Sequence, residues 1–421
     1  MAQTQPQSFA TRRALVFIFV TLLVESIGLG VIIPVAPKII AELIVHGADD
    51  AQAMSRAAQW GGWLFFVYAL MQFLCAPLIG NLSDRFGRKP VLVTSLLALG
   101  VDYAITGLAP SIAWLFVGRF LSGIAGASYT TAYAYIADIT PPEKRAANFG
   151  LTGAAFSVGF VVGPALGGLL GSLGPRLPFL VAAGLALANG LFGLLVLKES
   201  LAPENRRRFE LWRANPVGAL MALSKFPNIV TLCVVIILVR LAHDSNPSVF
   251  SYYVYAKFHW SPQMVGYALM TVGTLMALVY GVLVRVVIPR IGETASVYLG
   301  LSSGALGFAG YAFATESWLM FAWMIPFALF AFVMPALNSI MSKSVGPTEQ
   351  GELQGGLACI GSLTSIAAPP LLTNLFSYFT SPEAPVDFPG AAFLAASMCL
   401  LAAAAVFASI RVPSPALQQA R

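Results

Sequence analysis

The side chains best suited to chemistry in this chain are acids and bases that interrupt long apolar runs. A carboxyl group removed from water favours its protonated form, so it can take up a proton on one side and release it on another. An arginine stays charged, so it must find an anion or a water-filled cavity. We therefore expect these groups to carry protons or to exchange ion-pair partners within a non-polar layer. They are Glu25, Asp102, Arg119, Arg240, His243 and Asp244.

Glu25 is the leading candidate for the proton carrier. It stands eleven residues into the first apolar run, which corresponds to about 17 Å along a helix and therefore to the middle of a bilayer. A structural hydrogen bond to a neighbouring helix is the alternative role. Asp102 lies at a similar depth, and a hydrogen bond from a neighbouring tyrosine or serine would equally explain its presence there. Arg119 is expected near one of these two acids.

The cluster in the seventh apolar run has two explanations. Arg240 and Asp244 are four residues apart, so on a helix they could simply neutralise each other. His243, however, can titrate in the physiological range, and Pro247 frees backbone groups towards a cavity. Proton coupling and an internal ion pair both remain open at this stage.

These groups must be positioned by membrane-spanning helices. Of the 421 residues, 58% are hydrophobic and 10% are charged, and the mean hydropathy is +0.79, whereas soluble domains have about 25% charged residues. A span needs about 20 apolar residues, and this measure predicts an all-α membrane protein with twelve spans. The first run lacks a cleavage site after it and is expected to be retained. The expected spans are residues 14–37, 59–80, 91–109, 112–137, 149–171, 177–197, 228–255, 264–288, 295–314, 317–337, 355–378 and 389–410.

Charge and internal similarity predict how the spans are arranged. Most lysines and arginines fall on the same side as the two ends of the chain, which predicts cytoplasmic termini. Tyr68-Ala-Leu-Met71 returns as Tyr267-Ala-Leu-Met270, and Arg85 and Gly87 return 205 residues later as Arg290 and Gly292. Two related bundles are therefore expected. The expected divisions are an N-terminal six-helix bundle at 1–197, a cytoplasmic linker at 198–227 and a C-terminal six-helix bundle at 228–421.

The linker carries a basic run at 206–208 and a stretch at 216–225 that could form a surface helix. Attraction to anionic lipid headgroups and a plain connecting role are both compatible with it. The net charge of +6 does not indicate nucleic-acid binding, because the cations stand in separate loops. The four cysteines are far apart, so neither a metal site nor a cofactor is expected. A membrane-embedded enzyme is disfavoured, because no nucleophile–base pair is recognisable around His243.

A short charged segment, Gly80 to Pro90, stands between the second and third spans. We expect a turn at the water side in which Gly87 permits a tight bend and Asp84 bonds a neighbouring helix end. Asp138 and Arg145 flank the next turn on the same side and are expected to face this segment. The candidate gating residues are Asp84, Arg85, Arg88, Asp138 and Arg145.

This segment resembles the signature loop between helices 2 and 3 of the major facilitator superfamily, in which a charge relay latches two halves. Gly80, Asp84, Arg85, Gly87, Arg88 and Lys89 match that pattern position by position. The setting of Arg119 between Gly118 and Gly123 resembles a superfamily arginine that is linked to proton handling. The fifth span resembles a motif of the antiporter branches, and its glycines recur at helical spacing, which also suits close helix packing. The residues of that motif are Gly159, Gly163, Pro164, Gly167 and Gly168.

Along nearly its whole length the chain is similar to the tetracycline/H⁺ antiporters. Three departures matter. Glu25 stands where that family has aspartate, Met276 where it has a histidine, and Gly304 where it has a second aspartate. Since tetracycline leaves as a metal-chelate cation in that family, the loss of these polar groups argues against tetracycline itself, and a tetracycline-like compound remains an alternative substrate.

The sequence thus predicts a proton-coupled antiporter of the inner membrane, with a small-molecule substrate, protons and the lipid bilayer as partners and a monomeric state. The substrate is expected to be a small amphipathic organic compound or drug, as in antibiotic resistance. The alternatives are a proton-coupled uptake symporter of a metabolite or siderophore, and a non-transporting membrane sensor or scaffold. The expected substrate contacts are Gln72, Tyr129, Tyr133, Asn246, Phe250 and Tyr253.

Overall fold

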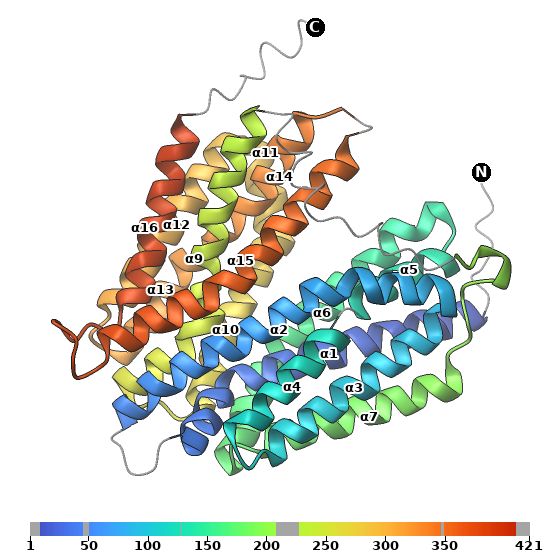
Figure 1. Ribbon diagram of the computed structural model, residues 1–421. Helices are drawn as coiled ribbons and strands as arrows, with labels where there is room; N and C mark the ends of the chain where they lie inside the picture. Colours follow the sequence, from blue (N-terminus) through green and yellow to red (C-terminus); the bar gives the residue numbers. More distant parts are fainter. Residues whose placement is uncertain (1–8, 45–49, 127, 208–226, 347–348, 410–421) are drawn as a thin grey trace, which may run out of the picture. The chain divides into compact units, whose positions relative to one another are not determined.

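A computed structural model describes residues 9–44, 50–126, 128–207, 227–346 and 349–409 of the chain (Figure 1). All regular structure within these residues is helical, as the hydropathy pattern predicts. The predicted surface helix at 216–225 lies outside the described residues. Contacts divide the chain into two compact units: unit 1, residues 1–214 with 260–270, and unit 2, residues 215–259 with 271–421. The division at 197 and 228 stays a prediction.

Unit 1 contains seven of the described α-helices and the first part of an eighth. Its members are α1 (Phe9–Ile44), α2 (Asp50–Phe86), α3 (Arg88–Leu108), α4 (Ile112–Ala125), α5 (Ser128–Ile139), α6 (Pro142–Leu173), α7 (Leu177–Val196), the 3-10 helix η1 (Pro203–Asn205) and the beginning of α10 (Pro262–Leu278).

Unit 2 contains the remaining described helices. They are α9 (Pro227–Phe258), the rest of α10, the π-helix η3 (Val279–Leu283), α11 (Val284–Ile291), α12 (Glu293–Phe313), α13 (Ser317–Leu329), the 3-10 helix η4 (Phe330–Phe332), α14 (Val333–Lys343), α15 (Gln350–Phe379) and α16 (Ala391–Ala408).

Eleven helical stretches of the described chain are long and apolar enough to cross a membrane, and each corresponds to a predicted span. The remaining predicted span, 295–314, is the 21-residue helix α12, whose glycines and serines lower its hydropathy. Many helices continue beyond the apolar run that predicts them, as in α1 with its 36 residues. Hydropathy marks only the part of a helix that lies in lipid.

The glycines of α6 bring it into backbone contact with α1. A side chain on Gly163 would lie within 2.7 Å of the carbonyl oxygen of Ile27 and 2.9 Å of Cα of Gly30. Gly159 and Gly167 face Ser26 and Val31 of the same helix. The glycines spaced at i+4 therefore do form one packing face, and their partner is the helix that carries Glu25.

The next residue of the motif, Gly168, faces another part of unit 1. A side chain there would lie 3.0 Å from Cα of Gly266, near the beginning of α10. This close approach of two glycines explains why residues 260–270 group with unit 1 rather than with the rest of α10.

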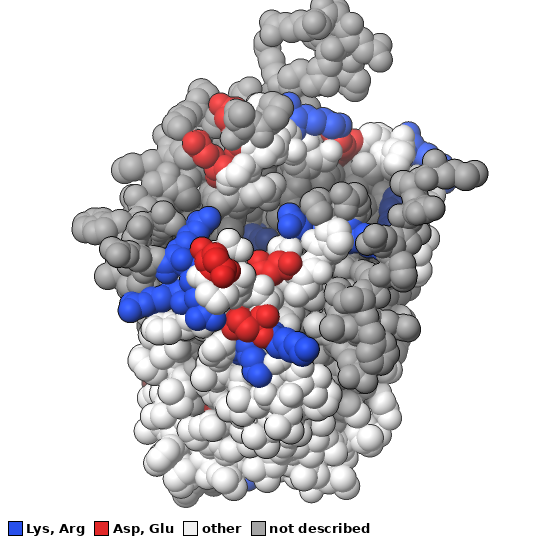
Figure 2. Space-filling view, turned by 90° about the vertical axis from the view of Figure 1, so that its right-hand side faces the viewer, with Lys and Arg blue, Asp and Glu red and all other residues white. Residues whose placement is uncertain are grey.

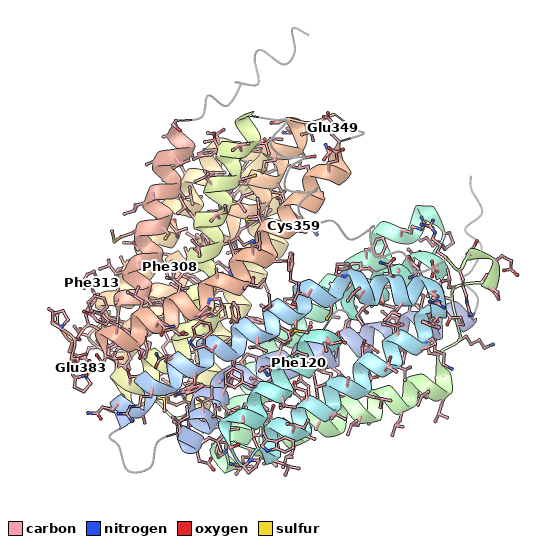
Figure 3. All side chains as sticks on the ribbon, in the orientation of Figure 1. Phe120, Phe308, Phe313, Glu349, Cys359 and Glu383 are labelled. Atoms are coloured by element: carbon pink, nitrogen blue, oxygen red, sulfur yellow. The ribbon has the colours of Figure 1, made fainter. Side chains whose placement is uncertain are left out.

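Aromatic side chains form much of the core of unit 2, and one of them, Phe308, is labelled in Figure 3. Phe308 of α12 is fully buried, with ring centroids 5.0 Å from Phe327 and 6.2 Å from Phe393. Tyr311, one turn further along α12, packs against Phe393 at 5.5 Å. This packing fixes the positions of α12, α13 and α16 relative to one another.

The predicted turn at 80–90 is wrong as a loop, because α2 continues through Phe86 and α3 begins at Arg88. Only Gly87 interrupts the helices, with φ 106° and its amide donating to the Ser83 carbonyl oxygen at 3.1 Å. Gly292 stands 205 residues later between α11 and α12, with φ 82° and the same kind of bond to Ile288. Positive φ at both joints explains why glycine is needed there.

Candidate functional site

A cavity inside unit 1 collects the charged side chains that the sequence places at mid-membrane depth. Helices α1, α2, α3 and α4 all contribute to its wall. Its lining residues are Glu25, Leu29, Tyr68, Leu99, Asp102, Tyr103, Arg119, Ser122, Ala125 and Gly126. Three of the six proton-coupling candidates are thus brought together in one space.

Asp102 and Arg119 form an ion pair in this cavity. Nη2 of Arg119 lies 2.8 Å from Oδ2 of Asp102, whose side chain is 0% exposed, against 15% for Arg119. The hydroxyl of Thr106, one turn further along α3, donates to the other carboxylate oxygen at 3.4 Å. Arg119 also lies over the ring of Tyr68 at 6.0 Å. A buried pair of this kind is stable only because each charge keeps its partner.

Glu25 lines the same cavity from α1 and is 4% exposed. Its helix is fixed here by α6, whose glycines allow the two backbones to touch. Tyr103 also lines the cavity, and its ring fills the space beside Gly28, one turn beyond Glu25. The cavity therefore holds two carboxyl groups and one permanent cation, so a change in proton occupancy alters the balance of charge within it.

A second charged cluster joins the ends of helices in unit 1. Arg88 lies 2.6 Å from Asp84 and 3.2 Å from Asp138, and it also donates to the Ser83 hydroxyl at 3.0 Å. The Ser200 hydroxyl donates to Asp138 at 3.0 Å. Figure 2 shows acidic and basic side chains next to one another on one face of the molecule, with a broad uncharged surface below them.

Glu199, which the sequence analysis does not single out, is central to this cluster. Its carboxylate accepts hydrogen bonds from the backbone amides of Arg88 at 2.8 Å and Lys89 at 3.3 Å. These are free amides in the first turn of α3, so the acid stabilises the start of that helix. The signal in the sequence is an acidic residue directly after an apolar span. The amides that it bonds, however, belong to residues more than 100 positions earlier in the chain.

The other two gating candidates lie elsewhere. Arg85 lies over the ring of Phe86 at 5.1 Å, and Nε of Arg145 donates to the carbonyl oxygen of Thr140 at 3.2 Å. The expected contact between Arg145 and the 80–90 segment stays a prediction, since the bond described for this arginine goes to the turn just before its own helix.

Unit 2 contains a counterpart of this cluster with its charges reversed. Glu293 and Lys343 stand 205 residues after Arg88 and Asp138, and Nζ of Lys343 lies 2.5 Å from Oε1 of Glu293. Ser339 donates to the same oxygen. Partial burial opposes ionisation of Glu293, but the two hydrogen bonds and the charge of Lys343 outweigh it and hold the pKa of this carboxyl below its ordinary value.

The expected pair between Arg240 and Asp244 does not form among the described residues. Oδ1 of Asp244 instead lies 3.3 Å from Nδ1 of His243. Oδ2 of Asp244 and Nε of Arg240 are both buried without a hydrogen-bond partner. The ring of His243 lies 6.3 Å from that of Phe330 in η4. These three residues belong to unit 2.

Two of the expected substrate contacts in unit 1 bond neighbouring side chains or backbone. Nε2 of Gln72 donates to the carbonyl oxygen of Gly126 at 3.2 Å, which joins α2 to the end of α4. The hydroxyl of Tyr133 accepts a hydrogen bond from Thr152 at 2.9 Å, and much of its ring is exposed. The side chain of Tyr129 lies outside the described residues.

In unit 2, Phe250 and Tyr253 lie in the packed aromatic core, and their role as substrate contacts stays a prediction. Both are fully buried; Phe250 packs edge-on against Tyr311 at 6.0 Å, and Tyr253 donates to the Tyr311 carbonyl oxygen at 2.6 Å. Aromatic residues late in a span can serve a helical core as well as a ligand. Asn246 is also buried, but its Nδ2 has no hydrogen-bond partner.

No group of three or more histidine, cysteine, aspartate or glutamate side chains within the described residues is arranged to hold a metal ion.

Known proteins are similar to this chain in sequence and in fold. The Major Facilitator Superfamily model matches residues 18–313 and 232–421. The chain is 39% identical over 367 residues to the tetracycline resistance protein, class C, of Escherichia coli, covering 87% of this chain and 90% of that protein. It is 34% identical over 356 residues to the class G protein of Vibrio anguillarum, covering 84% and 88%. The crystal structure of the nucleoside transporter NupG is similar in fold, with a TM-score of 0.73, 14% identity and coverage of 95% and 98%.

Proposed function

The chain belongs to the Major Facilitator Superfamily, and from this premise we propose that it is a proton-coupled antiporter that exports a small amphipathic organic compound. The observation that carries the proposal is the unit 1 cavity, where Glu25 shares one space with the Asp102–Arg119 pair. Relatives named for tetracycline resistance support export of a drug-like compound rather than uptake of a metabolite.

In the proposed mechanism, the proton occupancy of Glu25 sets the charge of the cavity. Protonated Glu25 is neutral and leaves Arg119 with Asp102 as its counter-ion. Once Glu25 loses its proton, its carboxylate competes with Asp102 for Arg119, and the pairing can shift. A proton that enters from outside the cell restores the first arrangement. Export is driven because only one of the two arrangements favours bound cargo.

Packing in unit 2 supports a cargo other than the tetracycline–metal chelate. At Gly304, where related antiporters have an aspartate, a side chain would lie within 3.0 Å of Phe330 and Leu400. Met276 packs with Val279 and Phe332 in an apolar cluster. Neither position offers a polar group to a cationic chelate, so the cargo is expected to be recognised by other residues.

We assign the Arg88 cluster a latching role within the transport cycle. Arg88 holds the ends of α2 and α5 together through Asp84 and Asp138, and Glu199 holds the start of α3. Breaking and remaking such charged hydrogen bonds lets helix ends move as a group. The protein is proposed to act as a monomer of the inner membrane with both termini in the cytoplasm.

The test is proton flux in proteoliposomes that contain the full chain and a pH-sensitive dye inside. A panel of amphipathic compounds, tetracycline among them, is added to find one that releases protons on exchange. Glu25→Gln is expected to bind that compound but to lose coupled proton flux. The matched control is Glu42→Gln, because Glu42 lies on the same helix, is 49% exposed and pairs with Arg176.

Coupled flux at the wild-type ratio in Glu25→Gln would contradict the assignment of the proton carrier. The direction of accumulation under an imposed pH gradient separates export from uptake. Cargo that accumulates on the acidic side is expected for an antiporter, whereas accumulation on the alkaline side would identify a symporter instead.

A further inference from the structure

Helix α9 of unit 2 holds an unusual number of buried polar atoms without partners. Among the described residues, Nε of Arg240, Oδ2 of Asp244, Nδ2 of Asn246 and Oγ of Ser251 are buried and make no hydrogen bond. With about 3.6 residues per turn, the spacings from 240 to 244 and from 244 to 251 place three of these residues on one face of the helix. One face of α9 therefore presents a guanidinium nitrogen, a carboxylate oxygen and a hydroxyl that no other described group satisfies.

Such an arrangement is costly unless a ligand completes it. A buried polar atom that loses its water without gaining another partner destabilises the protein, and a charged group does so more strongly. Arginine cannot lower this cost by giving up its proton, because it stays charged in proteins. The nearest carboxylate on the helix, Asp244, lies against His243 instead of the guanidinium. The missing group beside Arg240 is therefore an anion.

The guanidinium of Arg240 faces a glycine of α15 rather than a larger side chain. A Cβ atom built on Gly361 of α15 would meet only Cζ and Nη2 of Arg240, both at 4.0 Å, which is ordinary contact. A larger side chain at this position would extend into the space beside the arginine. The charge of Arg240 also acts on Tyr280, in the π-helix η3. Single π-helical turns are frequent at functional sites.

We propose that Arg240 binds a carboxylate, or an equivalent planar oxyanion, on the transported compound. The flat guanidinium can donate two parallel hydrogen bonds to such a group, which explains why an arginine suits this position. In this proposal Gly361 leaves space for the anion, and Tyr280 lies within reach of the charge of Arg240. Asp244, one turn along α9, accepts a hydrogen bond from a donor group of the same compound. This inference rests on the proposed export function and narrows its cargo to anionic or zwitterionic compounds.

The test uses matched fluorescent probes that differ only in the anion. Dansyl-phenylalanine carries a free carboxylate and a large apolar group, and its methyl ester lacks the charge. Fluorescence titration of the purified full chain is expected to give at least about tenfold tighter binding of the acid than of the ester, because hydrogen bonds to charged groups contribute about 1.5–3 kcal/mol. Equal affinity for acid and ester would overturn the proposal.

Two variants locate the site. Arg240→Gln is expected to lose the preference for the acid, and Arg240→Lys to retain part of it, since lysine keeps the charge but not the planar pair of donors. Gly361→Leu is expected to weaken acid binding while Arg240 remains present. An acid preference that survives in Arg240→Gln would place the anion elsewhere and contradict the assignment.

Thermal unfolding of the ligand-free variants checks that they fold and gives a second readout. Arg240→Gln should be as stable as wild type or more stable, because it removes a partly buried charge whose Nε makes no hydrogen bond. A large loss of stability would show that Arg240 serves packing and would overturn the binding role.

Competition identifies the source of the anion. Inorganic phosphate at 50 mM, or mixed micelles containing phosphatidylglycerol, is added to the acid titration. If the site serves organic cargo, neither addition should displace the probe. Displacement by the lipid would assign the site to a headgroup and contradict the cargo proposal. The titration needs no proton gradient. Its result is therefore independent of the proton-flux experiment on Glu25, and either experiment can fail while the other succeeds.

Discussion

At the scale of single residues, this molecule depends on charges that are buried with a partner. Asp102 is sealed from solvent, so its carboxylate is tolerated only beside Arg119 and the Thr106 hydroxyl. Arg119 in turn needs that carboxylate, since it cannot give up its proton. Arg240 is the contrasting case, because none of the described residues provides its anion.

The Asp102–Arg119 pair makes a prediction about stability. Asp102→Asn leaves the arginine buried without a counter-charge and is expected to destabilise the protein by about 3–5 kcal/mol. Replacing both residues, as Asp102→Asn with Arg119→Gln, should restore part of that loss, because no unpaired charge remains. Thermal unfolding of the two single variants and the double variant in detergent measures this recovery. Strictly additive losses would show that the two side chains are not coupled.

Glu293 makes a prediction about pH. The pKa of its carboxyl is lower in the folded protein than its ordinary value of 4.5, so the ionised form stabilises the fold. That stabilisation is complete above the ordinary pKa and is lost as the pH falls through the lower, folded value. The expected contribution is at most about 1 kcal/mol, because the partner lysine is largely exposed.

Thermal unfolding of wild type and Glu293→Gln across a pH series checks this direction. Wild type should be the more stable of the two at neutral pH, and the difference should shrink under acidic conditions. A difference that grows as the pH falls would contradict the assignment of the lowered pKa.

How much of the site follows from sequence can be seen at these residues. Charges inside apolar runs identify Glu25, Asp102 and Arg119, because lipid leaves few reasons for an ionisable group to be there. The sequence does not identify the partner of each charge. Asp244, for example, lies against the adjacent His243 and not against Arg240, although Arg240 stands four residues away on the same helix. Glu199 was missed because its role depends on amides that only the folded chain brings to it.

At the scale of helices, close packing positions Glu25, the proposed proton carrier. The backbone of α1 is held against α6 through glycines, and the Pro164 ring lies beside Gly30, where a Cβ would approach its Cδ to 2.7 Å. Sequence spacing predicts that such a face exists, but it does not say which helix the face meets. That choice depends on how several helices pack at once.

The α1–α6 contact can be tested with two glycines of the same helix. Gly163→Ala places a methyl group against the backbone of α1, and overpacking of this kind costs about 1–3 kcal/mol. Gly153→Ala is the control, because nothing lies within 4 Å of its Cβ position. The control should stabilise α6 by about 0.5–1 kcal/mol, since alanine is the better helix former. Equal thermal stability of the two variants would mean that the α6 face does not restrain α1.

Helix ends were less predictable than helix interiors. The sequence places a turn at 80–90 because charges there end the apolar run, yet α2 continues past Asp84. Asp84 and Arg88 bond each other across Gly87, so this ion pair joins the end of α2 to the start of α3. Hydropathy detects the boundary of the membrane rather than the end of the helix.

At the scale of the whole molecule, the two units repeat one helix joint with opposite charges. Each joint has a glycine at positive φ, followed by a charged residue that pairs with another helix end. In unit 1 the residue after the glycine is the cation Arg88, which pairs with Asp138. In unit 2 it is the acid Glu293, which pairs with Lys343. The repeat at an offset of 205 is visible in the sequence, whereas the reversed pair appears only once the partner helices are in place.

Exchanging the charges within each pair tests whether the joints are equivalent. In unit 2, Glu293→Lys with Lys343→Glu keeps opposite charges together and should leave the thermal stability within about 1 kcal/mol of wild type. In unit 1, Arg88→Glu with Asp138→Lys should remain less stable than wild type by at least about 1 kcal/mol, because the new carboxylate would stand beside Asp84. Adding Asp84→Asn to the second exchange removes that repulsion and should recover part of the loss. Recovery in both units without the third change would mean that Asp84 contributes little to the Arg88 cluster, and the latch would then be a simple pair like its counterpart.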